Sequence, residues 1–177
     1  FKSDLFSLKV PGKMFETPTS EDNQRQFFSP ELTNGSYFSV KQISHYSYFT
    51  ELKLNDYKLK VDSLLYESIP GNIIQKKQVE KNGFSGLDIL NQTANGNFQR
   101  YQIIYTPLNI FIFKMGGKKD FVKNQSDDFF NSIQLKTGSE DDWQKVTSFK
   151  GDFSVKVPQY YHIKNNNRIT SLYNHPE

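Results

Sequence analysis

Few residues in this sequence have the types and spacing that catalytic chemistry requires. The chain contains no cysteine, so it has no thiolate nucleophile, no disulfide and no cysteine-ligated metal. Its histidines are His45, His162 and His175, and their spacing fits no common metal-binding motif. We therefore expect no catalytic residue, no metal and no cofactor, and the sequence favours a binding protein over an enzyme.

Acidic and glycine-rich segments give other candidate sites, and each has a structural explanation. Asp127 and Asp128 are adjacent on a predicted helix, where neighbouring side chains do not face each other, and acids there complement the helix dipole. Residues 140–142 are all acidic but lack the alternating spacing of a calcium loop. Residues 115–118 lack the frame of a phosphate-binding loop. The segment Gly83–Gly86 indicates a turn, and the alternative hypothesis of a hydrolase or hydrolase-accessory domain would place its site beside that turn.

The strongest candidate for binding is an aromatic segment that contains His45, Tyr46, Tyr48 and Phe49. Aromatic side chains in a connection between elements can anchor a partner. The same residues would instead be structural if the segment continues a strand and is covered by a following helix. Both interpretations stay open, and these four residues are the predicted binding site.

Charge and hydropathy limit the kind of partner. The chain has 22 basic and 19 acidic residues, and its formal net charge is +3. The lysines are scattered among acids, whereas nucleic-acid binding favours a dense basic stripe. No apolar run approaches the ~20 residues that cross a bilayer. We therefore expect a protein partner, either another copy or a different chain, with no nucleic acid and no transmembrane segment; the sequence does not indicate a small-molecule ligand.

Strand and helix periodicities alternate through residues 1–136. A helix is predicted from Leu54 to Leu65 because apolar side chains recur at helical spacing. A second, short helix is predicted from Ser126 to Ile133 with Ser126 as its N-cap. Asn82-Gly83 predicts a tight hairpin turn. The strands are expected at 6–10, 25–29, 36–46, 72–80, 84–90, 98–106 and 110–115, the last of them a central strand with apolar side chains on both faces.

The two ends of the chain carry similar sequences. The segment Phe1–Pro11 recurs as Phe149–Pro158 with one residue dropped. The two segments lie a domain's length apart, which is too far for a solenoid repeat and indicates a tandem duplication. We expect a first domain at 1–136, a polar linker at 137–148 and the start of a second, incomplete copy at 149–177. Another interpretation is that Phe153–Val157 adds as an edge strand to the first domain or to a neighbouring molecule.

Three of these segments also carry a family resemblance. The opening Phe6–Gly12 motif, the Gly83–Gly86 turn and the closing Asp127–Ile133 motif resemble the PsbP-like superfamily. That superfamily includes photosystem extrinsic proteins, a Ran-binding nuclear import factor and bacterial domains of unassigned role. The resemblance implies an α+β fold in which an antiparallel β-sheet is sandwiched between helices, an α/β/α arrangement. It transfers no catalytic residue, because the motifs are packing and turn signatures.

The function expected from these observations is a non-enzymatic protein-binding or assembly module. It would be one of at least two tandem copies in a longer bacterial protein, since repeated domains raise the effective concentration at a partner. An extracytoplasmic location, either periplasmic or secreted, is the expected compartment.

Overall fold

The structure is a computed structural model that describes residues 1–20, 24–31, 35–44, 69–106, 109–136, 143–148, 151–158, 161–164 and 168–171. The chain divides into two compact units, Phe1–Leu135 and Lys136–Glu177.

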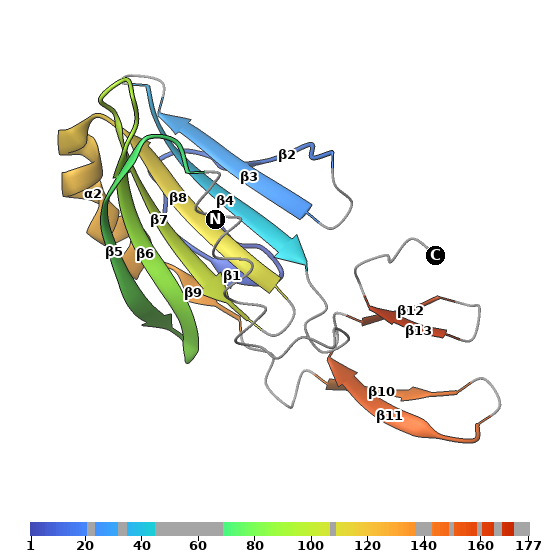
Figure 1. The fold of residues 1–177 in the computed structure, drawn as a ribbon. Helices are drawn as coiled ribbons and strands as arrows, with labels where there is room; N and C mark the ends of the chain where they lie inside the picture. The colour runs from blue at the N-terminus through green and yellow to red at the C-terminus, as the bar shows by residue number, and fades with distance from the viewer. Residues whose placement is uncertain are drawn as a thin grey trace. The chain divides into compact units, whose positions relative to one another are not determined.

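A seven-stranded sheet forms the body of the first unit (Figure 1). Its strand order is β2-β3-β4-β8-β7-β6-β5, and all neighbouring strands are antiparallel. β8 lies in the middle of the sheet and most of its residues are buried, which confirms the predicted central strand. The strands of this sheet are β2 (Phe15–Thr17), β3 (Gln24–Glu31), β4 (Ser36–Ser44), β5 (Asn72–Lys81), β6 (Phe84–Gln92), β7 (Phe98–Tyr105) and β8 (Asn109–Gly117).

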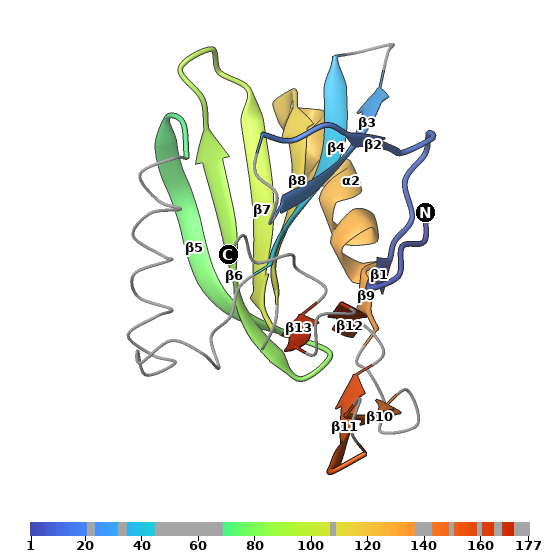
Figure 2. The same cartoon turned by 90° about the vertical axis from the view of Figure 1, so that its right-hand side faces the viewer.

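Aromatic side chains build the core between this sheet and the elements that cover one of its faces. Helix α2 (Lys119–Asn131) lies across that face (Figure 2), and the ring of Phe129 lies 4.9 Å from that of Phe38. The short strands β1 (Phe6–Ser7) and β9 (Gln134–Leu135) pair beside it. Phe6 is fully buried, and its ring contacts the rings of Phe111 and Phe113 edge-on. Burial of such rings is the main source of stability in a chain with a modest apolar content.

The expected fold class is wrong. The described residues are mostly β-strand, with α2 as the one helix among them, so they do not form a helix-sandwiched α/β/α arrangement. Alternating aromatic and β-branched residues favour the long strands that dominate this chain. The helix predicted from Leu54 to Leu65 lies outside the described residues. Some α+β character remains, since α2 packs on the sheet.

The closing helix differs from its prediction in length and in how it begins. It starts at Lys119, after Lys118 as N-cap, rather than at Ser126. Ser126 is buried within the helix, and its Oγ accepts a hydrogen bond from Arg100 Nη1 at 2.7 Å. The buried face runs from Val122 through the polar Ser126 to Phe129 and Phe130. Because Ser126 interrupts the apolar spacing, the sequence pattern finds the end of the helix and misses its first turns. Phe129 and Phe130 are buried as predicted.

The second unit contains two separate antiparallel strand pairs among its described residues. β10 (Trp143–Thr147) pairs with β11 (Ser154–Pro158), and β12 (Tyr161–Lys164) pairs with β13 (Arg168–Ser171). β10 lies within the segment 137–148 that was expected to be a linker. The assignment of 149–177 to a second copy of the first domain stays a prediction.

No helix in the described part of the chain is long and apolar enough to cross a membrane.

Candidate functional site

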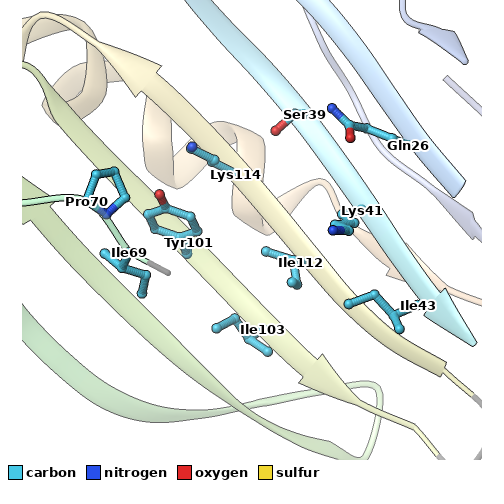
Figure 3. Close-up of a pocket in the computed structure, with 10 residues that line it drawn as sticks. All are labelled: Gln26, Ser39, Lys41, Ile43, Ile69, Pro70, Tyr101, Ile103, Ile112 and Lys114. Atoms are coloured by element: carbon cyan, nitrogen blue, oxygen red, sulfur yellow. The ribbon is translucent and has the colours of Figure 1, made fainter. Parts of the chain in front are cut away.

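The candidate site lies on the sheet face that points away from α2. Along β8, Phe111 and Phe113 pack on Phe6. Because side chains alternate between the two faces of a strand, Ile112 and Lys114 point to the opposite face. Figure 3 shows both side chains in front of the sheet, with the helix behind it.

Strand register brings a cationic residue and apolar residues together on this face. Lys114 lies opposite Tyr101 of β7 and Ser39 of β4, while Ile112 lies opposite Ile103 and Lys41. These neighbours line a cavity of about 270 Å³, which is close to the lower limit of ordinary small-ligand pockets. Its lining consists of Gln26, Ser39, Lys41, Ile43, Ile69, Pro70, Tyr101, Ile103, Ile112 and Lys114 (Figure 3).

At one end of this cavity, Lys114 and Tyr101 belong to a hydrogen-bonded cluster that also contains Tyr37 and Gln99, which line a neighbouring pocket. These four residues are here called the tyrosine–lysine cluster. Lys114 Nζ lies 5.3 Å from the ring centre of Tyr37 and 5.0 Å from that of Tyr101, so both rings stabilise its charge. Gln99 Nε2 donates to Tyr37 Oη at 2.7 Å. Tyr101 Oη donates to Gln99 Oε1 at 2.7 Å. The Gln99 amide thus fixes both phenol groups beside the ammonium group.

The protonation of this cluster favours binding over catalysis. Burial by itself lowers the pKa of Lys114, but its hydrogen bond to Tyr37 and its proximity to Tyr101 outweigh burial, so the pKa of Lys114 lies above its ordinary value. Burial raises the pKa of Tyr101, and the charge of Lys114 opposes only part of that shift. A lysine nucleophile or a tyrosinate base needs a lowered pKa. The cluster instead presents an ammonium ion beside the neutral phenol group of Tyr101, and this ammonium ion can hold an anion.

A glycine allows Tyr37 to reach this position. A Cβ atom on Gly116 would lie 2.6 Å from Cζ of the Tyr37 ring, which is closer than real Cβ atoms approach another atom. Gly116 of β8 lies opposite Tyr37 of β4 in the sheet. Without a side chain on Gly116, the Tyr37 ring can lie across the central strand toward Lys114.

The other end of the cavity is mostly aliphatic, with Lys41 of β4 opposite Ile112. Ile43, Ile69, Ile103 and Ile112 line it, and all four belong to or pack against a core cluster that also contains Ile89. Ile103 is almost fully buried, whereas Ile43 and Ile112 are partly exposed. The cavity therefore has a cationic end and an aliphatic end.

A second polar cluster lies on the α2 side of the sheet, and its cation is fully paired. Arg100 binds Asp88 through two hydrogen bonds of 3.0 and 2.8 Å and also contacts Asp127 at 2.7 Å. Its guanidinium group lies 5.2 Å from the ring centre of Phe130. Burial alone would raise the pKa of Asp88, but hydrogen bonds from Arg100 and Gln102 outweigh it, and the pKa of Asp88 lies below its ordinary value. This cluster joins α2 to the sheet, and we assign it a structural role.

The sequence-predicted site residues belong to a segment that the structure does not describe. His45, Tyr46, Tyr48 and Phe49 lie outside the described residues, so their binding role stays a prediction. Within the described residues, no three His, Asp or Glu side chains gather as metal ligands would.

The Gly83–Gly86 segment has a structural explanation. Gly83, at φ 78°, forms the predicted hairpin turn with Asn82. Lys81 Nζ donates to the carbonyl of Phe130 at 2.7 Å. Asn82 Oδ1 accepts from the backbone of Leu135 at 3.1 Å. The polar side chains beside the turn thus bind α2 and β9.

Sequence reasoning missed the whole tyrosine–lysine cluster, although one signal was present. Period-two alternation along β8 places Lys114 on the same face as Ile110 and Ile112. A lysine in the middle of a central, otherwise apolar strand is unusual. Finding its partners Tyr101 and Tyr37 requires the register of three strands, which no local pattern supplies.

Comparison with known proteins gives distant structural likeness only. No family model and no curated protein sequence matches the chain. A crystal structure from Bacteroides thetaiotaomicron matches at a TM-score of 0.44 and 12% identity over 80% of this chain, which spans 49% of that one. The cyanobacterial PsbP of Synechocystis matches at a TM-score of 0.42 and 11% identity, over 73% of this chain and 98% of its own. LpqN of Mycobacterium tuberculosis is described as involved in cell envelope biogenesis. It matches at a TM-score of 0.39 and 11% identity, over 75% of this chain and 83% of its own. A PsbP structure is among those that the chain resembles, at low identity.

Proposed function

We propose that the first unit is a non-enzymatic binding module that recognises an anionic group at Lys114. One observation carries this proposal. Lys114 is a partly buried cation whose neighbours in the described structure are phenol groups, with no carboxylate ion-paired to it. Burying a charge is costly unless it is paired. An anionic group of a partner would therefore pair with the ammonium group of Lys114, and this contact would supply most of the partner's affinity.

The contrast with Arg100 supports this proposal. The guanidinium group of Arg100 has Asp88 and Asp127 as partners, so its charge is neutralised within the protein. Lys114 and Lys41 both line the cavity. No acidic residue is among its described lining residues. The charged side chains of the described lining are therefore both positive, which favours an anionic partner.

The wider hypothesis is a protein-binding or assembly module that belongs to the PsbP-like superfamily and occurs in at least two tandem copies of a longer, extracytoplasmic bacterial protein. The repeat of Phe1–Pro11 at Phe149–Pro158 supports the tandem arrangement, and the motifs at Phe6–Gly12, Gly83–Gly86 and Asp127–Ile133 support the family. The full open reading frame tests the arrangement, because a chain that ends near Glu177 would contradict it.

The anion-binding proposal is tested by NMR titration of the full chain with sodium acetate and with methylammonium chloride at equal ionic strength. Acetate should shift the amide resonances of Tyr101 and Lys114, and methylammonium should not. Lys114→Gln should abolish the acetate response. Lys123→Gln, which changes an exposed lysine of α2, should preserve it. Equal responses to both salts, or an acetate response that survives in Lys114→Gln, would contradict the proposal.

A further inference from the structure

The two ends of the cavity differ in chemistry, which restricts the ligand further than charge alone. The cationic end is formed by Lys114 beside Tyr101. Two residues further along β7, and two residues back along β8, Ile103 and Ile112 form the aliphatic wall. At a rise of about 3.3 Å per residue, the two ends lie about 7 Å apart along the strands. A ligand that fills both ends must carry an anionic head and an apolar tail.

The volume of the cavity limits the size of that ligand. Its volume of about 270 Å³ corresponds to roughly nine water molecules at ~30 Å³ each. A ligand that fills it therefore has about eight to ten non-hydrogen atoms, which matches a straight-chain acid of about six to eight carbons. This size favours a small molecule over a folded partner.

The polar groups favour a carboxylate over a phosphate. Phosphate sites in proteins are commonly built from arginine forks or helix N-termini. No arginine is among the described lining residues, and α2 packs on the opposite face of the sheet. The cations of the lining are the ammonium groups of Lys114 and Lys41. These compact point charges suit a singly charged, two-oxygen head.

We propose that this cavity binds a medium-chain aliphatic carboxylate. Its head would lie at Lys114 Nζ, and its tail would lie along Ile103, Ile112 and Ile43. The ligand class rests on the proposed function, because both require an anion at Lys114. It adds that the aliphatic end of the cavity takes part in binding.

The test is isothermal titration calorimetry of the full chain with acetate, butanoate, hexanoate and octanoate. Burial of a methylene group contributes about 0.8 kcal/mol, so each added methylene should tighten binding about fourfold until the cavity is full. Octylamine and 1-octanol carry the same tail without the anionic head, and both should bind at least tenfold more weakly than octanoate.

Variants separate the head from the tail. Lys114→Gln should weaken hexanoate and octanoate binding by a similar factor and leave the dependence on chain length intact. Ile43→Ala changes a partly exposed lining residue and should flatten the dependence on chain length while acetate binding persists. Lys123→Gln, on α2, should change neither the affinity for carboxylates nor its dependence on chain length. The melting temperature of each variant shows whether it folds. The comparison of octanoate with octylamine and 1-octanol uses the unaltered chain, so it tests the proposal even if a variant fails to fold.

The outcomes distinguish the two proposals. If acetate and octanoate bind equally well and both depend on Lys114, the anion-binding function stands and the aliphatic ligand class is overturned. If octanoate binds no better than octylamine or octanol, or if no carboxylate binds, both proposals fail. A fourfold gain per methylene together with dependence on Lys114 supports both.

Discussion

Two cationic side chains on opposite faces of one sheet show how local partners decide a residue's role. Arg100 and Lys114 lie on neighbouring strands, β7 and β8. Arg100 is paired with two carboxylates, whereas Lys114 lies over the rings of two tyrosines. A cation that is neutralised internally stabilises the fold. A cation held only by neutral phenols retains its charge for a partner, so we assign structure to the first and binding to the second.

The structural role of Arg100 leads to a prediction about stability. The side chain of Asp88 is only 5% exposed, and Arg100→Met would leave this carboxylate buried and unpaired. Loss of one partner from a buried ion pair typically costs about 3–5 kcal/mol, and we expect a loss of that size in the free energy of unfolding. Urea denaturation at neutral pH measures it. The matched control is Asp127→Asn, because Asp127 is 76% exposed and an exposed pair contributes about 0–1 kcal/mol.

The same pair predicts how stability depends on pH. Because Arg100 and Gln102 hold the pKa of Asp88 below its ordinary value, ionised Asp88 stabilises the folded state. This contribution is complete above the unfolded-state pKa of about 4 and is lost as the pH falls through the lower folded-state pKa. In Arg100→Met, ionised Asp88 does not stabilise the folded state at any pH. The stability difference between the wild-type protein and the variant should therefore narrow in acid, and a difference that stays constant or widens would show that Asp88 is not the group involved.

At the scale of elements, close contact between β4 and β8 positions the site. Gly116→Ala would place a methyl group about 2.6 Å from the Tyr37 ring, so the ring must move away from Lys114. Overpacking of this kind costs about 1–3 kcal/mol. We expect that loss in urea denaturation together with weaker acetate binding, because the Tyr37–Gln99 hydrogen bond depends on the ring position. Gly12→Ala is the control, since its Cβ would meet Ser29 Oγ at an ordinary 3.4 Å; an equal effect from both substitutions would contradict the explanation.

The elements also show what sequence patterns can predict. The strands expected at 25–29 and 36–46, the Asn82-Gly83 turn and the central β8 were predicted correctly, since each depends on local alternation or turn chemistry. The first turns of α2 were missed because their apolar spacing is incomplete. The α/β/α class was wrong because it came from a family resemblance rather than from the strand content. The site could not be predicted, since Tyr37, Tyr101 and Lys114 meet only through the register of three strands.

At the scale of the whole molecule, the two units differ in how much structure supports them. The first unit has a seven-stranded sheet with a buried aromatic core. The described strands of the second unit form two-stranded sheets, and its Phe153 and Val155 are exposed. An isolated pair of strands is marginally stable in water. Residues 149–177 as the start of a second copy stay a prediction, which can be tested through the stability of these strands.

Hydrogen exchange tests this difference in the chain as it stands. Amide protection depends on the free energy of the local opening that exposes each hydrogen bond. The amides of β8 should open only with global unfolding of the first unit, whereas those of β10 and β11 should exchange orders of magnitude faster. Extending the chain through a complete second copy should raise the protection of β10 and β11 to the level of β8. Equal protection of β8 and β10 in the 177-residue chain would show that the second unit is already complete, and the tandem-copy hypothesis would fail.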